Sequence, residues 1–225
     1  SKGDIRSQGF DLNGIWVPYY NLHKTMAGLR DAYRLCNNNK ALLVEQKLAD
    51  WIERIVAPLN DGQIQKMLDC EHGGINEVLV DLYYDTGRKK YLDLSWKFHH
   101  KVILDSLANG KDILPGIHGN TQIPKLIGLA RRYELTGNKQ DYKAATFFWD
   151  RVVNHHSYVT GGHGNHEYFG QPDSLKNRLS SGTTETCNVY NMLKLSSHLF
   201  QWKPDAKIAD YYERALFNQI LSSQH

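Results

Sequence analysis

The sequence predicts an all-α fold in which helical hairpins repeat to form part of an (α/α) toroid. Three observations predict this fold. A unit of about 50 residues recurs along the chain. No segment shows sustained strand alternation, and polar side chains gather where the first helix of each unit begins.

The repeat is marked by an aromatic residue four positions before each turn. Tyr33, Tyr83, Tyr133 and Phe200 precede Asn37, Gly87, Gly137 and Pro204 in this way. Apolar residues at helical spacing lie before each turn, and the pattern of a second helix follows it. Glycine suits the left-handed conformation that ends a helix, which explains Gly87 and Gly137. We expect four hairpins, each with its first helix on the inside.

The polar residues favour a closed toroid over an open solenoid. They stand at the starts of successive inner helices: His23, then Glu71 and His72, then His118, Asn120 and Gln122, then Glu185 and Cys187. Equivalent helices of a repeat array run parallel, so these starts share one end. In a closed array they would converge on a single pocket.

A longer connection separates the third and fourth turns, and it reads as an active-site loop over residues 158–182. Its best acid is Glu167, because the adjacent Tyr168 and Phe169 could desolvate the carboxyl group. A solvated loop glutamate is the alternative.

The fourth inner helix begins with a carboxylate and a thiol two residues apart, Glu185 and Cys187, and Thr186 is the expected N-cap. The positive end of a helix dipole favours a thiolate. Glu185 and Cys187 could therefore be half of a zinc site. A small buried cysteine beside a solvated glutamate is the alternative.

Five motifs resemble the DUF1680 proteins, the glycoside hydrolase group that contains the β-L-arabinofuranosidases of families 127 and 146. They occur in the family's order and cover the chain from about residue 14 onward: WVPYYNLHK at 16–24, EHGGINE at 71–77, HGNTQIPK at 118–125, TGG at 160–162 with EYF at 167–169, and ETCNVYNMLKL at 185–195.

The resemblance implies an (α/α)6 barrel followed by β-sandwich domains, and a retaining, exo-acting β-L-arabinofuranosidase. It implies that Glu167 is the general acid/base and that Glu185 and Cys187 are zinc ligands. The family's other two ligands are adjacent cysteines, one of them the nucleophile, and this sequence has no such pair. We therefore expect residues 1–225 to be part of one barrel domain, lacking an upstream hairpin and the downstream domains. Its zinc site should be incomplete and its activity absent.

Sugar contacts are predicted at the helix starts and on the loop: His23, His72, His118, Asn120, Gln122 and Tyr168. A structural capping role is the alternative for His72 and His118. Trp16, Tyr19 and Tyr20 could form a stacking face for a pentose or a hydrophobic staple. His99, His100, His155 and His156 are expected at the surface.

Composition excludes some partners. A net charge of +3 with scattered basic residues does not suggest nucleic acid, and no apolar run approaches membrane-spanning length. A carbohydrate containing L-arabinofuranoside is the expected partner, and such a substrate would favour a secreted or periplasmic location.

Unpaired ends of the array would favour self-association. The expected exposed apolar residues are Met26, Leu29, Tyr33, Tyr211, Leu216 and Ile220.

Two other functions remain open from the residues alone. A toroidal lyase or epimerase would use histidine and tyrosine as base and acid, without a thiolate. A helical-repeat interaction module would have no catalytic role.

Overall fold

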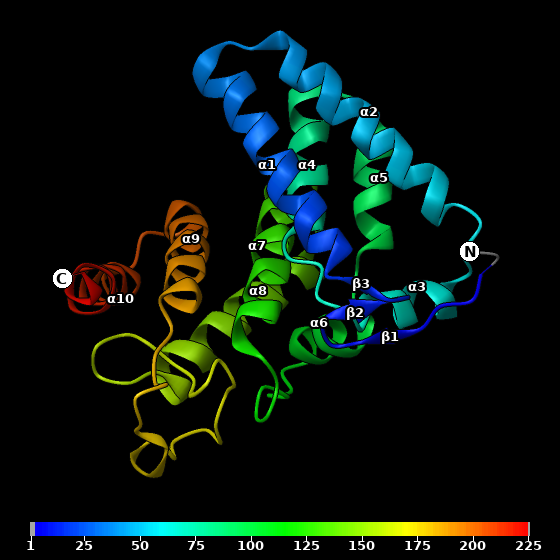
Figure 1. Ribbon diagram of the computed structural model, residues 1–225. Helices are drawn as coiled ribbons and strands as arrows, with labels where there is room; N and C mark the ends of the chain where they lie inside the picture. Colours follow the sequence, from blue (N-terminus) through cyan, green and yellow to red (C-terminus); the bar gives the residue numbers. More distant parts are fainter. Residues whose placement is uncertain (1–2, 225) are drawn as a thin grey trace. The chain divides into compact units, whose positions relative to one another are not determined.

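A computed structural model describes residues 3–224 (Figure 1), and the chain divides after Lys101 into two compact units, each considered by itself. The first unit contains three short antiparallel strands and five helices: β1 (Ser7–Gln8), β2 (Asp11–Leu12), β3 (Ile15–Trp16), α1 (Pro18–Cys36), α2 (Asn39–Val56), α3 (Asp61–Leu68), α4 (Ile75–Thr86) and α5 (Lys89–Lys97). Figure 1 shows the strands beside α3.

The second unit is helical apart from one long loop. Its elements are α6 (Lys101–Ala108), α7 (Gly119–Thr136), α8 (Lys139–Arg151), a π-helical turn (Val152–His156), a 3-10 turn (Lys176–Arg178), α9 (Thr186–Trp202), α10 (Ala206–Ala215), a second π-helical turn (Leu216–Ile220) and a final 3-10 turn (Leu221–Ser223). The predicted loop lies between α8 and α9. No helix among residues 3–224 is long and apolar enough to cross a membrane.

The four predicted hairpins are present in this part of the chain as α1/α2, α4/α5, α7/α8 and α9/α10. Asn37, Gly87 and Gly137 end their helices in the left-handed conformation, with φ of 53°, 69° and 68°. The fourth turn differs, because Lys203 is extended (φ −151°) and Pro204 then prevents the helix from continuing. Sequence analysis missed the strands and the short helices α3 and α6.

The inside–outside assignment is confirmed for three hairpins and wrong for one. α4, α7 and α9 contain eight, twelve and eight buried residues, whereas α5, α8 and α10 contain four, five and two. α1 buries only Tyr19, His23 and Met26, while α2 buries five residues. The three lie on one narrow strip of α1, the side that α2 and α4 cover.

The expectation of exposed apolar residues is wrong, because none of the six is exposed. Met26 is fully buried, and Tyr211 is packed edge-on against Trp149 with ring centroids 5.9 Å apart. The other four, Leu29, Tyr33, Leu216 and Ile220, are half-buried.

Inner helices run parallel within each unit. In the first unit His23, near the start of α1, contacts Gly74 at the start of α4, and Arg34 pairs with Asp85 at the other end. In the second unit Asn120 and Asn191 join the starts of α7 and α9. Glu134 and His198 join their later turns. The polar starts of neighbouring inner helices therefore lie together, as the repeat predicts.

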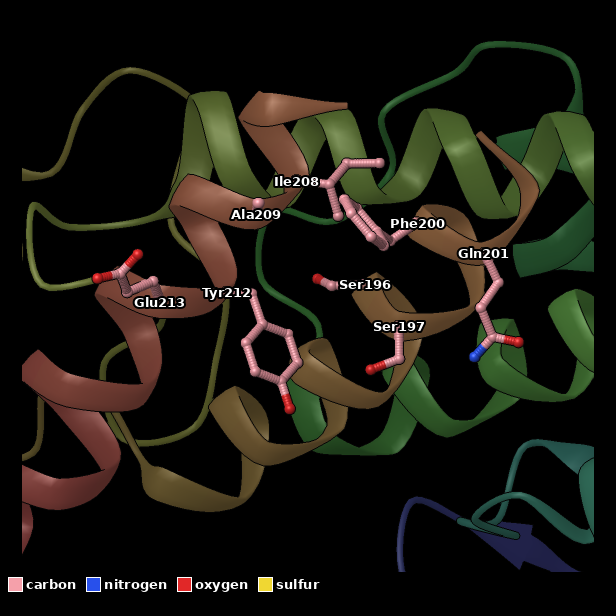
Figure 2. Close-up of a pocket in the computed structure, with 8 residues that line it drawn as sticks. All are labelled: Ser196, Ser197, Phe200, Gln201, Ile208, Ala209, Tyr212 and Glu213. Carbon is pink, nitrogen blue, oxygen red and sulfur yellow. The ribbon is translucent and has the colours of Figure 1, made fainter. Parts of the chain in front are cut away.

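A mostly apolar groove of about 360 Å³ lies between α9 and α10 (Figure 2). None of the predicted site residues lines it: it is formed by Ser196, Ser197, Phe200, Gln201, Ile208, Ala209, Tyr212 and Glu213. In the preceding hairpin, Tyr133 of α7 and Tyr142 of α8 are covered by Trp202 of α9, with ring centroids 4.7 and 5.5 Å away. Phe200 and Ile208 occupy the repeat positions that correspond to Tyr133 and Tyr142. The groove therefore resembles the surface that a following repeat would cover.

A buried carboxyl group on α2 makes the stability of the first unit depend on pH. Glu45 has no exposed surface, and its pKa is raised from 4.5 to about 8, chiefly by burial; Asp85 and Asp81 contribute to this rise and Arg30 opposes it. The folded protein holds Glu45 protonated where the unfolded chain ionises it. Stability contributed by this group is therefore full below pH 4.5 and is lost as pH rises toward 8.

We predict that the unfolding free energy of Glu45→Gln, relative to that of the parent, increases by about 3 kcal/mol as the pH rises from 5 to 7.5. Urea titrations at the two pH values measure this change. Glu53→Gln on the same helix is the control, since that side chain is 43% exposed. A gain that did not change with pH would contradict the assignment.

Candidate active site

The tip of the long loop is fixed to the start of α7 by backbone hydrogen bonds. The N–H of Gly116 donates to the carbonyl of Phe169 (2.9 Å), and the N–H of Phe169 donates to Ile117 (3.0 Å). The N–H of Gly119 donates to the carbonyl of Glu167 at 2.7 Å. The backbone of Glu167, although part of the loop, is therefore held by hydrogen bonds to the start of α7.

The backbone at the tip is unusual for non-glycine residues. His166 and Glu167 both have positive φ, 47° and 71°. Such conformations persist only where the surroundings impose them, and they cluster at functional sites. The carboxyl group of Glu167 contacts Nε2 of His118, and its side chain is 46% exposed, so an acid is held in place yet open to a ligand.

The two aromatic neighbours of Glu167 have different roles. Tyr168 is partly exposed, and its ring meets His118 edge-on with centroids 5.2 Å apart. Phe169 is 1% exposed and packs in the core against Phe148. The expectation that both rings would desolvate the Glu167 carboxyl is wrong for Phe169, because its backbone pairs with Gly116 and Ile117 and its ring packs in the core against Phe148 and His163.

His118 is the N-cap of α7. Its Nδ1 accepts a hydrogen bond from the backbone N–H of Thr121 at 3.2 Å, and the Thr121 hydroxyl lies 2.8 Å from the same atom. The capping alternative is thus confirmed for His118. Its contact with a sugar stays a prediction.

The predicted amide contacts are partly engaged with the scaffold. The Oδ1 atom of Asn120 accepts from Nδ2 of Asn191 on α9 at 2.7 Å. Gln122 is buried, donates to the carbonyl of His118 (3.3 Å) and accepts from Lys125 (2.9 Å). Both side chains stabilise the joined helix starts.

Glu185 and Cys187 begin α9, but the N-cap is Glu185, so the prediction of Thr186 is wrong. Thr186 already has helical geometry, because α9 starts one residue earlier than expected. Cys187 is exposed in the first turn, and Oε2 of Glu185 is buried without a hydrogen-bond partner among the described residues.

No group of three His, Cys, Asp or Glu side chains within residues 3–224 is placed to hold a metal ion. His163 is fully buried and stacks on Phe169 at 5.2 Å, while the ring of His166 lies against Gly182. Neither histidine completes a three-ligand set with Glu185 and Cys187. Two donors alone do not fit zinc, which takes three or four protein ligands.

Sequence analysis missed Asn188, the residue after Cys187. Its side chain is fully buried, and neither amide atom has a partner in the described part of the chain. The amide nitrogen lies 3.0 Å from the position that a Cβ on Gly119 would take. Its place in the first turn of α9, facing the start of α7, was the available signal.

In the first unit, two predicted histidines are bound to backbone groups. Nδ1 of His72 lies 3.0 Å from the carbonyl of Cys70, to which it donates. Nδ1 of His23 accepts from the N–H of Gly74 at 3.1 Å. Both side chains are buried.

The surface expectation is wrong for two other histidines. His100 is buried and its ring meets His72 at 5.9 Å. His156 is buried with Nε2 3.0 Å from Asp112. Their acidic partners, Asp69 and Asp112, come from distant parts of the sequence.

Trp16 and Tyr19, on either side of the first residue of α1, do not form one aromatic face. Trp16 is 67% exposed, whereas Tyr19 is buried against Phe98 with ring centroids 5.1 Å apart.

Comparison with known proteins decides the family. The sequence profile of the β-L-arabinofuranosidase GH127 catalytic domain matches residues 3–225. The chain belongs to this family. A non-reducing end β-L-arabinofuranosidase of Bifidobacterium longum subsp. longum is 26% identical over 221 residues, which cover 83% of this chain and 32% of that protein. Membership of a glycoside hydrolase family favours hydrolysis over the lyase, epimerase and interaction-module alternatives.

Solved structures agree on the fold. A GH127 β-arabinofuranosidase superposes with a TM-score of 0.69 at 26% identity, covering 89% of this chain and 33% of its own. The GH127 enzyme of Geobacillus stearothermophilus T6 gives 0.65 at 19% identity, covering 89% and 36%. An α-1,6-mannanase of family GH76 from Salegentibacter, at 12% identity, TM-score 0.58 and coverage of 97% and 64%, shares the fold alone. The chain spans about a third of the length of its GH127 relatives.

Buried His163 gives the second unit an acid-sensitive group. Burial lowers its pKa from 6.5 to about 3, and the neighbouring His156 adds to the effect. Below pH 6.5 the His163 imidazole is protonated in the unfolded chain but stays neutral in the folded chain. Stability therefore falls as the pH decreases from 6.5 toward 3.

We predict that lowering the pH from 6.5 to 5 costs the parent about 2 kcal/mol more unfolding free energy than it costs His163→Leu, measured by urea titration. His155→Leu is the matched control, because His155 is partly exposed and lies 3.0 Å from Asp173. Equal acid sensitivity of the parent and His163→Leu would refute the role of His163.

Proposed function

We propose that this chain supplies the acid/base half of a retaining, exo-acting β-L-arabinofuranosidase. The observation that carries the proposal is the Glu167 carboxyl group, partly exposed and held against His118 where α7 begins. The GH127 profile spans this region. Since the chain covers about a third of its relatives' length, the activity is proposed for a protein that carries it together with the relatives' remaining parts.

In the first step the Glu167 carboxyl would donate its proton to the glycosidic oxygen while the bond from that oxygen to the anomeric carbon breaks. A nucleophile on the opposite face of the sugar forms the glycosyl–enzyme bond. In the second step the Glu167 carboxylate would take a proton from water, whose oxygen attacks the anomeric carbon and releases the nucleophile. The nucleophile in this proposal is a cysteine outside this sequence, which has no adjacent cysteine pair.

Glu185 and Cys187 would contribute a carboxylate oxygen and a thiolate to a zinc site completed by ligands outside this chain. A metal bound there would keep the nucleophilic cysteine, which lies outside this sequence, in its thiolate form. The first-turn position of Cys187 supports this role, because the helix dipole favours the thiolate.

The substrate in this proposal is a glycan ending in L-arabinofuranose. His118, Asn120, Gln122 and Tyr168 would contact its hydroxyl groups. The sugar contacts expected of His23 and His72 stay predictions. Self-association through exposed apolar residues also stays a prediction; Phe200 and Tyr212 beside the α9/α10 groove are its better candidates.

We predict that Glu167→Gln, in a protein that carries the whole catalytic barrel, slows hydrolysis of β-L-arabinofuranosides with poor leaving groups by about 10²–10⁴-fold. Aryl substrates with activated leaving groups need little protonation and should lose about tenfold or less in the first step. A leaving-group series of kcat/KM measures this difference. Glu213→Gln on α10 is the control, and equal losses across the series would remove Glu167 from the acid role.

For the metal, we predict that this chain alone binds zinc weakly and does not hydrolyse aryl β-L-arabinofuranosides. Cys187→Ser should abolish even the weak binding, because the thiolate is its strongest donor. Competition with a chromophoric chelator measures the affinity. Cys36→Ser is the matched control, since Cys36 is also an exposed cysteine; identical affinities for the parent and Cys187→Ser would remove Cys187 from the ligand set.

A further inference from the structure

The hydrogen bonds of His118 determine which of its ring nitrogens carries the proton. A backbone N–H can only donate, so Nδ1, which receives the N–H of Thr121 at 3.2 Å, must be an acceptor. The neutral ring then carries its proton on Nε2, the atom that contacts Oε2 of Glu167. The start of α7 thus fixes the ring as a donor toward the carboxyl group.

The cap depends on this tautomer. An N–H on Nδ1 would face the N–H of Thr121, and the start of α7 would lose its side-chain cap.

We infer that His118 is a positioning residue for Glu167: its imidazole, held in the Nε2–H form by the α7 cap, donates to the carboxylate form of the acid/base. The inference rests on the proposed function of Glu167. It assigns to His118 a role in addition to, and separable from, contact with a sugar hydroxyl.

A donor of this kind acts differently on the two steps. It stabilises the ionised carboxylate that must accept a proton from water. The protonated carboxyl group must instead leave this hydrogen bond, or present its other oxygen, to reach the glycosidic oxygen. The other titratable or charged groups on the elements packed around the loop tip are His166, Tyr168 and Arg178 on the loop and Glu185 and Cys187 at the start of α9.

The sequence offers a substitution that separates the cap from the donor. Asparagine caps α2, α3 and α8 in this chain, through Asn38, Asn60 and Asn138, each accepting backbone N–H groups on its side chain. His118→Asn should therefore keep the start of α7 while removing the imidazole Nε2–H. His155→Asn is the matched control, because His155 pairs with Asp173 in the same unit, away from the α7 cap.

The first test needs no turnover. Long-range ¹⁵N–¹H correlation spectra of this chain report the protonation state of each imidazole. We expect the neutral His118 ring to carry its proton on Nε2, and Thr121→Pro, which lacks the capping N–H, to lose that preference. A neutral ring with its proton on Nδ1 would overturn the inference.

The second test uses the pH profile of kcat/KM in a protein that carries the whole catalytic barrel. The alkaline limb reports loss of the acid's proton in the free enzyme. The carboxylate loses a hydrogen bond without the Nε2–H donor, so His118→Asn should move this limb to higher pH, and His155→Asn should not. A lower rate with an unmoved limb would reduce His118 to a structural cap. Absence of turnover in the parent would defeat the proposed function and leave the spectroscopic result standing.

Discussion

The backbone pairing between the long loop and the start of α7 is the constraint on which the candidate site depends. It favours glycine at position 119, where a Cβ would lie 3.0 Å from the Asn188 amide nitrogen and 3.3 Å from the Glu167 carbonyl oxygen. The loop's first part is fixed at Gly161, whose Cβ would lie 2.7 Å from that of Ala215, and the Tyr211 hydroxyl donates to its carbonyl at 3.1 Å. A segment anchored to α7 and α10 can hold an acid with the precision of a helix.

Parallel packing of the inner helices explains why chemistry gathers at one end. The starts of α7 and α9 lie together, and the orphan N–H groups of each helix terminus attract acceptors and negative charge. Glu167 and Cys187 both stand in that environment, one on the loop and one on the helix. This packing also buries amides unfavourably: neither amide atom of Asn188 has a hydrogen-bond partner among the described residues.

Local rules predicted the hairpins well, because their information is local. The pattern of a glycine that ends a helix with an aromatic residue four positions earlier can be recognised from a short stretch of sequence. Gly87 and Gly137 end their helices as predicted. Burial of histidines is not local. His100 and His156 read as surface residues, yet each is buried beside an aspartate supplied from elsewhere in the sequence. The direction of Phe169 was also beyond reach, since it follows from pairing with Ile117.

Backbone contacts also give each predicted histidine a direction. Nδ1 of His23 and of His118 receives a backbone N–H, so in the neutral ring the proton is on Nε2, a donor. Nδ1 of His72 instead donates to a carbonyl, which leaves Nε2 as the acceptor nitrogen of the neutral ring. A sugar hydroxyl meeting His72 would have to donate, and one meeting His23 would have to accept. The donor of His118 is already directed at Glu167. Three histidines that look equivalent in the sequence therefore have three different hydrogen-bonding roles. In each, the backbone group that contacts Nδ1 determines the role of Nε2.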